Sequence, residues 1–174
     1  MLRKTRFLLA VIATAIVGGL VLGGCGYTPA PILPDYIKSI AVHTFENSTI
    51  QYGIEEKLSI STTDEFLRDG RLDIGKREDA EGLLTGTITQ YVLEPVSYDE
   101  QDIIEEYKLW ITVDLVFTDL VSNTVLWDEA GMEGSVNYFV TSRAGELVET
   151  EDEAQDRLVE ELAEDIVRRT IDGW

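Results

Sequence analysis

The clearest pattern along the chain is a strict alternation of apolar and polar positions between Tyr107 and Phe117. The apolar set at every second residue is Tyr107, Leu109, Ile111, Val113, Leu115 and Phe117. Because successive side chains of a strand point to opposite faces, this spacing predicts a β-strand with one buried face. The opposite face would carry Lys108, Thr112, Asp114 and Thr118, with Trp110 and Val116 adding apolar surface. We expect that second face to meet solvent or a partner.

Four further segments have the composition of strands: Ile37–Phe45, Arg71–Gly75, Gly82–Val96 and Val125 to about Val136. The first is apolar at most positions, which predicts a strand covered on much of both faces. Pro95 cannot donate a hydrogen bond, so we expect it at the edge or the end of its strand.

Turn residues separate these strands. The stretch 46–49 (Glu-Asn-Ser-Thr) predicts a turn after the first strand, and 121–124 (Val-Ser-Asn-Thr) predicts a hairpin turn. Gly131 and Gly134 lie inside the last strand and predict either a bulge or an early end. The polar stretch from Asn137 to Thr150 is expected to be a loop.

Two segments have helical periodicity. In the first, from about Tyr52 to Arg68, Ile54, Leu58, Thr62 and Phe66 recur every four residues, with Leu67 beside them. The second runs from Glu151 to about Ile171, and its broad apolar face comprises Leu158, Val159, Leu162, Ala163, Ile166, Val167 and Thr170. Thr150 and Glu153 fit a capping box at its start, and Gly70 can end the first helix.

The order of these elements is strand, helix, several strands, helix. This order indicates an α+β fold rather than alternating βαβ units. We predict a two-layer sandwich, with two helices packed on one face of a mixed, mostly antiparallel sheet of four to five strands.

The N-terminal segment has the pattern of a secretory signal. A positive region with Arg3, Lys4 and Arg6 precedes an uncharged, mostly apolar run from Phe7 to Leu22. Leu22-Gly23-Gly24-Cys25 then resembles the lipobox of bacterial lipoproteins, in which the chain is cut between Gly24 and Cys25 and the cysteine is acylated. The alternative is an uncleaved anchor with an incidental cysteine, but the apolar run is short for a permanent span.

These features divide the chain into three parts: a lipoprotein signal peptide at 1–24, a lipidated Cys25 with a Pro-rich tether at 25–36, and one domain at 37–174. The tether carries three of the four prolines and is expected to be extended. The lipid on Cys25 is the only bound group that we expect, so no cofactor is predicted. By resemblance to sorted lipoproteins, Gly26 after the cysteine favours the outer membrane.

The charge of the chain excludes some partners. The net charge is −19 and becomes −22 once the three positive residues of 1–24 are removed. A chain this acidic, with no basic stripe, is a poor ligand for nucleic acid. It is equally unsuited to broad adhesion to anionic headgroups. With Cys25 as the only cysteine, a disulfide framework is excluded.

The sequence offers no pattern of catalytic chemistry, and we predict no enzyme and no metal site. His43 is the only histidine, and it falls on a predicted strand, where a packed or surface side chain is the default. The acidic run Glu149–Glu153 lacks the spacing and glycine of a calcium loop. Trp110, Trp127 and Tyr138 could mark an interface or lie in the core.

Several segments together resemble one family. A lipobox followed by Cys25-Gly26-Tyr27, and then a strand with Ala41-Val42-His43-Thr44-Phe45-Glu46-Asn47, is similar to the LPS-assembly lipoprotein family LptE. Gly86-Thr87-Ile88, Leu126-Trp127 and the long terminal helix also fit this family. The first strand is also similar to that of other envelope lipoproteins, which act in curli-type secretion or activate penicillin-binding proteins.

The resemblance implies a periplasmic domain anchored in the outer membrane and bound tightly to LptD, a large β-barrel. The domain would sit partly inside this barrel as a plug, help it to assemble, and assist insertion of lipopolysaccharide into the outer leaflet. Because a domain of charge −22 repels a polyanion, we expect direct binding of lipopolysaccharide to be weak. The alternative function is an envelope lipoprotein that activates a peptidoglycan synthase or nucleates a secretion pore.

Overall fold

The computed structural model describes residues 33–142 and 147–173. The predicted signal peptide, the cleavage site at Gly24 and Cys25, and the first part of the tether lie outside the described residues.

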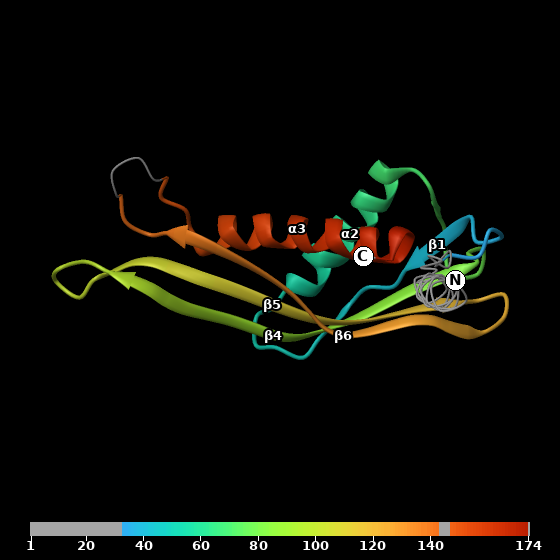
Figure 1. The fold of residues 1–174 in the computed structure, drawn as a ribbon, viewed down its shortest axis with the longest axis horizontal. Coiled ribbons are helices and arrows are strands. Elements are labelled where there is room, and N and C mark those ends of the chain that lie inside the picture. The colour runs from blue at the N-terminus through green and yellow to red at the C-terminus, as the bar shows by residue number, and fades with distance from the viewer. Residues whose placement is uncertain (1–32, 143–146, 174) are drawn as a thin grey trace, which may run out of the picture. The chain divides into compact units, whose positions relative to one another are not determined.

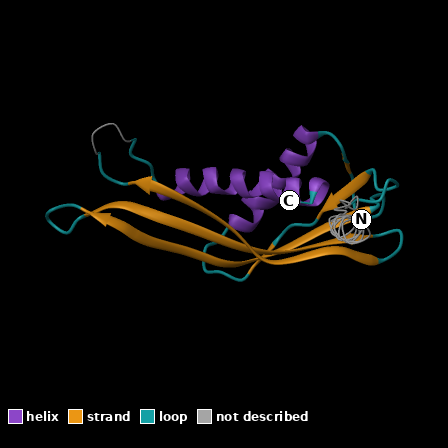
Figure 2. Cartoon of the chain, viewed as in Figure 1, coloured by secondary structure: helices purple, strands orange, loops and turns teal. Residues whose placement is uncertain are grey.

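Two helices and a mixed sheet form two layers (Figure 1). The strands are β1 (Ser39–Val42), β2 (Glu46–Asn47), β3 (Asp73–Ile74), β4 (Gly82–Tyr98), β5 (Ile104–Asp119) and β6 (Thr124–Phe139); the helices are α2 (Ile54–Asp69) and α3 (Glu151–Asp172). Figure 2 shows both helices on the same side of the strands. The predicted α+β arrangement is confirmed.

The sheet has the strand order β3-β1-β4-β5-β6, and the short β2 pairs with β4 outside this path. β1 lies parallel to β3 and β4, whereas the long ladders β4–β5 and β5–β6 are antiparallel. The sheet is therefore mixed and mostly antiparallel, as predicted. Pro95 lies in the part of β4 that pairs with β5 alone, at a free edge where a missing donor costs nothing.

The alternation that predicted β5 describes its two faces correctly. Leu109, Ile111, Val113, Leu115 and Phe117 are each at most 1% exposed and form the centre of the core. The residues between them, from Lys108 to Thr118, remain partly exposed. Burial of each large aliphatic side chain contributes about 1.5–3 kcal/mol, so this row fixes which face of β5 the helices cover.

The two helices pack against the buried row of β5 through the apolar faces that their periodicity predicts. In α2, Ile54, Leu58, Thr62 and Phe66 are fully buried, whereas Leu67 is 60% exposed and does not belong to the core. Every member of the predicted apolar face of α3 is buried. The capping box of Thr150 and Glu153 at the start of α3 is present in both directions.

The predictions for the first strand and the turn after it are partly wrong. β1 ends at Val42, and Phe45 instead enters the core, where its backbone N–H donates to the Ser59 hydroxyl of α2 at 2.8 Å. This detour lets Glu46 and Asn47, which we expected in a turn, return to the sheet as β2. The predicted strand is therefore shortened to β1, and part of the predicted turn forms the separate strand β2.

β6 is longer than predicted, because it passes both glycines and ends at Phe139. Gly131 has φ of 78° and lies where the register with β5 shifts, so the bulge is confirmed and the early end is wrong. Gly134 faces the helices: an added Cβ would lie 2.8 Å from Cγ of Leu162 and 2.9 Å from Cδ1 of Leu158. The absence of a side chain at Gly134 lets α3 approach the sheet.

The last residues of the predicted tether already contact the domain. Leu33 packs against the core, and the Tyr36 hydroxyl donates a hydrogen bond to the Asp119 carboxylate at the end of β5. Asp119 is 1% exposed and also accepts from the Ser122 hydroxyl at 2.6 Å and the Val121 backbone N–H at 2.8 Å. Tyr36 thus fixes the point at which the tether meets the domain, beside the β5–β6 hairpin.

We expect Gly134→Val to lower the free energy of unfolding by about 1–3 kcal/mol, because the new side chain overlaps Leu158 and Leu162 of α3. Ser135→Val is the matched control, since it adds the same side chain to the exposed face of the same strand. That control should stay within about 0.5 kcal/mol of the wild type. Urea unfolding measures both, and equal losses would contradict the close approach of α3.

Asp119 should make stability depend on pH in the acid range. The hydrogen bonds from Ser122 and then Tyr36 hold the pKa of Asp119 at about 2. A carboxyl with a lowered folded-state pKa contributes stability that is complete above its unfolded pKa of about 3.9 and is lost as the pH falls through about 2. Asp119→Asn should therefore weaken the domain at neutral pH and reduce its loss of stability between about pH 4 and 2.

Urea midpoints measured from pH 7 to pH 2 test this expectation. The control is Glu160→Gln, which removes one exposed carboxylate from α3 and should keep the pH dependence of the wild type. If Asp119→Asn and the wild type lose stability equally on acidification, Asp119 does not have the assigned role.

Candidate binding surface

The helices cover one face of the long strands and leave the other uncovered. We call this second face the outer face and define it by the side chains that alternate with the buried rows. Its members are Thr85, Thr87, Gln90, Val92 and Glu94 of β4; Glu106, Lys108, Trp110, Thr112, Asp114, Val116 and Thr118 of β5; and Asp128, Glu133, Ser135 and Asn137 of β6. The outer face is polar, with Trp110 as its largest side chain.

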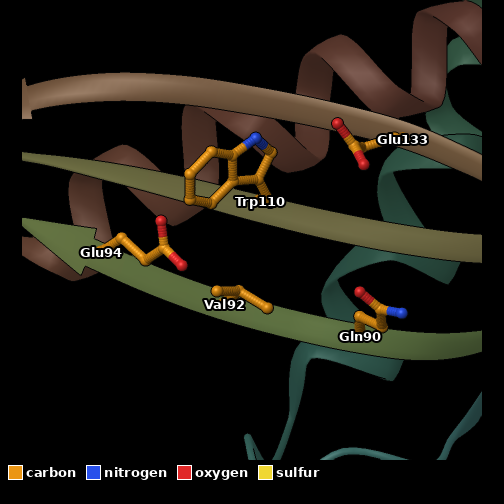
Figure 3. Close-up of a pocket in the computed structure, with 5 residues that line it drawn as sticks. All are labelled: Gln90, Val92, Glu94, Trp110 and Glu133. Atoms are coloured by element: carbon orange, nitrogen blue, oxygen red, sulfur yellow. The ribbon is translucent and has the colours of Figure 1, made fainter. Parts of the chain in front are cut away.

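Trp110 lies in a depression of about 350 Å³ on this face. Figure 3 shows Trp110 on the middle strand, with Gln90, Val92 and Glu94 on β4 to one side and Glu133 on β6 to the other. The register explains this grouping, because Val92 and Ser135 are the direct partners of Trp110, and Glu94 and Glu133 lie diagonally from it. The ladder pairs thus bring three separate strands to one aromatic ring.

The depression has both charge and an aromatic surface. Lys108 places its Nζ 4.6 Å from the centroid of the Trp110 ring, which is the geometry of a cation–π contact. Glu94 lies opposite Lys108 in the ladder, but the two are not within ion-pair distance. The side chains of Glu94, Glu133 and Gln90 have no hydrogen-bond or ion-pair partner within residues 33–142 and 147–173. These polar groups are free to bind a ligand or a partner.

A second depression of about 300 Å³ lies on the same face near β1 and β2, and its lining comprises His43, Glu46, Thr85, Gly86, Thr87, Asp114 and Val116. His43 is exposed here, and its backbone N–H donates to the Leu84 carbonyl at 2.9 Å. The part of the chain that the structure describes holds no cluster of three metal-ligating side chains.

The structure shows which of Trp110, Trp127 and Tyr138 lie in the core and which is exposed enough to form an interface. Trp127 is 7% exposed and stacks with Phe117 at a centroid distance of 6.0 Å. Tyr138 is 3% exposed and stacks with Tyr107 at 5.8 Å. Both belong to the core, and only Trp110 is available as an interface residue.

A polar cluster on the covered face lies beneath the start of α3. The Tyr91 hydroxyl donates to the Glu151 carboxylate at 2.6 Å and accepts from the Gln155 amide at 3.3 Å. Burial, followed by the nearby charge of Glu151, raises the pKa of Tyr138 to about 12, and burial with the Glu151 hydrogen bond raises the pKa of Tyr91 as well. Both tyrosines stay protonated at neutral pH, so Tyr91 holds the end of α3 as a donor.

Among the described residues, no helix is both long enough and apolar enough to span a membrane. Gly24 and Cys25, the predicted cleavage and lipidation residues, lie outside the described residues.

Comparison with known proteins identifies the family. The family model for lipopolysaccharide-assembly proteins, LptE, matches residues 37–170. The chain belongs to the LptE family. The resemblance deduced from the sequence is thereby confirmed, and the match covers both layers of the fold. No match was found among curated proteins.

Solved structures share the fold of this LptE family member at low sequence identity. A protein from Xanthomonas campestris has a TM-score of 0.56 and 11% identity, over 83% of this chain and 89% of that chain. A hypothetical protein from Chlamydia trachomatis has a TM-score of 0.54 and 11% identity, over 76% and 95%. A candidate lipoprotein from Caulobacter crescentus has a TM-score of 0.51 and 14% identity, over 75% and 89%. At these identities the likeness establishes the fold alone.

The sequence pointed to Trp110 but not to the residues around it. Gln90 and Glu94 meet Trp110 because the β4–β5 ladder, after a register shift between Ile88 and Gln90, pairs Val92 with Trp110. Glu133 meets Trp110 because the β5–β6 ladder pairs Ser135 with Trp110. Period two along one strand gives the face of each side chain, but it does not give the register between strands. The position of Glu94 and Glu133 on polar alternation sites was the signal that could have found them.

We expect Trp110 and Trp127 to differ sharply in their effect on stability. Trp127→Ala should lower the free energy of unfolding by about 3–5 kcal/mol, because it leaves a cavity beside Phe117. Trp110→Ala should cost about 1 kcal/mol or less, because its ring is half-buried on the outer face. Urea unfolding of the two variants gives the comparison, and similar losses would place Trp110 in the core.

Proposed function

We propose that this LptE family member is an outer-membrane lipoprotein that binds and plugs the LptD β-barrel. In this role it assists assembly of the barrel and the insertion of lipopolysaccharide into the outer leaflet. Cys25 carries the lipid after cleavage behind Gly24, and the domain faces the periplasm. The observation that carries the proposal is the family match over residues 37–170.

Two features of the domain support a role as a plug. Both helices lie on one side of the sheet, so that the domain presents a long, rigid polar face of β4, β5 and β6. A barrel of large diameter has a polar lumen, which such a face can contact while burying little apolar surface. The tether meets the domain at Tyr36, so a lipid on Cys25 would be joined to it by about ten residues that reach on the order of 30 Å.

The proposal includes no catalytic step and no cofactor. Direct binding of lipopolysaccharide is weak in this proposal, because the net charge after cleavage is −22 and a polyanion is repelled. In this proposal the domain acts by binding another protein, the barrel.

Co-purification tests the proposal. A tagged full-length chain extracted in detergent should bring down a large β-barrel in stoichiometric amounts. Cys25→Ser should abolish incorporation of labelled palmitate and release the domain from the outer-membrane fraction, since stable anchoring needs more than one acyl chain. Cys25→Ala is a second variant with the same expected loss, and Gly26→Ala, one residue away, is the control that should keep the lipid.

The outcomes separate the parts of the proposal. If the Cys25 variants lose the anchor but still bring down the barrel, Cys25 is the lipidation site, and the folded domain alone is sufficient to bind the barrel. Recovery of a peptidoglycan synthase or a secretion pore, with no barrel, would overturn the plug and favour the alternative function.

A further inference from the structure

The outer face has a charge of almost one sign. It carries the carboxylates of Glu94, Glu106, Asp114, Asp128 and Glu133, whereas Lys108 is the only lysine or arginine in β4, β5 and β6. Glu106 is already bound, because it accepts from the Asn137 amide at 2.7 Å. Asp114 is already bound, because it accepts the backbone N–H of Gly131 at 2.8 Å. Glu94 and Glu133 remain without a hydrogen bond or ion pair in the described chain. The outer face therefore presents negatively charged hydrogen-bond acceptors, and Lys108 is its single positively charged donor.

The Trp110 ring lies between the two free carboxylates, as Figure 3 shows. The Lys108 ammonium of the chain itself lies 4.6 Å from the ring centroid, which shows that the ring accepts a cation, although this ammonium also offsets part of the negative charge around it. An indole ring attracts cations through its quadrupole, and a guanidinium can stack on it while it donates to carboxylates at its rim. The depression therefore combines the two kinds of group that recognise arginine.

We propose that the outer face binds a basic segment of the barrel protein, with an arginine side chain of that segment stacked on Trp110 and paired with Glu94 or Glu133, which flank the ring on opposite sides. This inference rests on the proposed function, because it takes the barrel as the partner. Charge complementarity selects this occupant. A second copy of this acidic chain, an anionic saccharide and a bilayer with anionic headgroups would all be repelled by the same carboxylates.

The interaction is read out with the full-length, lipidated chain in detergent extracts. The test variant is Glu94→Gln with Glu133→Gln, which keeps the shape of the depression and removes two charges. The matched control is Glu160→Gln with Glu164→Gln, which removes two charges from the exposed side of α3. Recovered barrel is normalised to the barrel present in each extract, so that an effect on barrel assembly is not counted as an effect on binding.

We expect the outer-face variant to retain about tenfold less barrel than the wild type, and the α3 control to retain the wild-type amount. Trp110→Leu should also weaken retention, whereas Trp110→Phe should restore part of it, because a phenyl ring keeps a cation–π surface. Circular dichroism and urea unfolding of each variant separate loss of binding from loss of folding.

A photo-crosslinking residue at Val92, which lines the depression, identifies the occupant. The expected crosslink joins Val92 to a barrel peptide with an arginine or lysine within a few residues. A crosslink to lipopolysaccharide, to phospholipid or to a second copy would overturn the inference, as would full retention of the barrel by the outer-face variant. If the wild type retains no barrel at all, the proposed function fails first, and the inference falls with it.

Discussion

The apolar row of β5 is buried on one face only, and this one-sided burial determines where the two helices pack. A continuous row of apolar side chains, from Leu109 to Phe117, has to be removed from water, and α2 and α3 together cover it. The close approach at Gly134 brings α3 onto the sheet at the level of Leu158 and Leu162. Since both helices are needed on this side, none is left for the opposite side, and the outer face follows directly from how the core is built.

The parts of the fold that were predicted from sequence are those that depend on local sequence patterns. The alternation in β5, the four-residue spacing in α2 and the capping box of α3 each depend on near neighbours in the chain, and each is confirmed. The parts that were missed depend on distant residues. Burial of Phe45 against Ser59 breaks the first strand, and pairing with β4 turns Glu46 and Asn47 into a strand that no local pattern indicates.

The same distinction applies to the binding surface. Aromatic residues in the sequence marked three positions, and only tertiary packing decides that Trp127 and Tyr138 are core and that Trp110 is not. Family membership identifies the process in which the chain belongs, whereas the arrangement of Glu94, Trp110 and Glu133 is a feature of this chain's own register. Fold and family alone would not have located it.

The bulge at Gly131 affects how readily two copies of the chain can pair through their sheet edges. β6 is the last strand of the sheet, so its outer edge could template a neighbouring strand. If the chain is lipid-anchored, as proposed, its molecules meet by diffusion in two dimensions, where encounters between identical edges are frequent. The bulge interrupts the regular row of backbone groups on β6, and Pro95 removes a donor from the free edge of β4. These two local irregularities make edge-to-edge pairing of two copies less favourable, so the domain is suited to remain single at high local concentration.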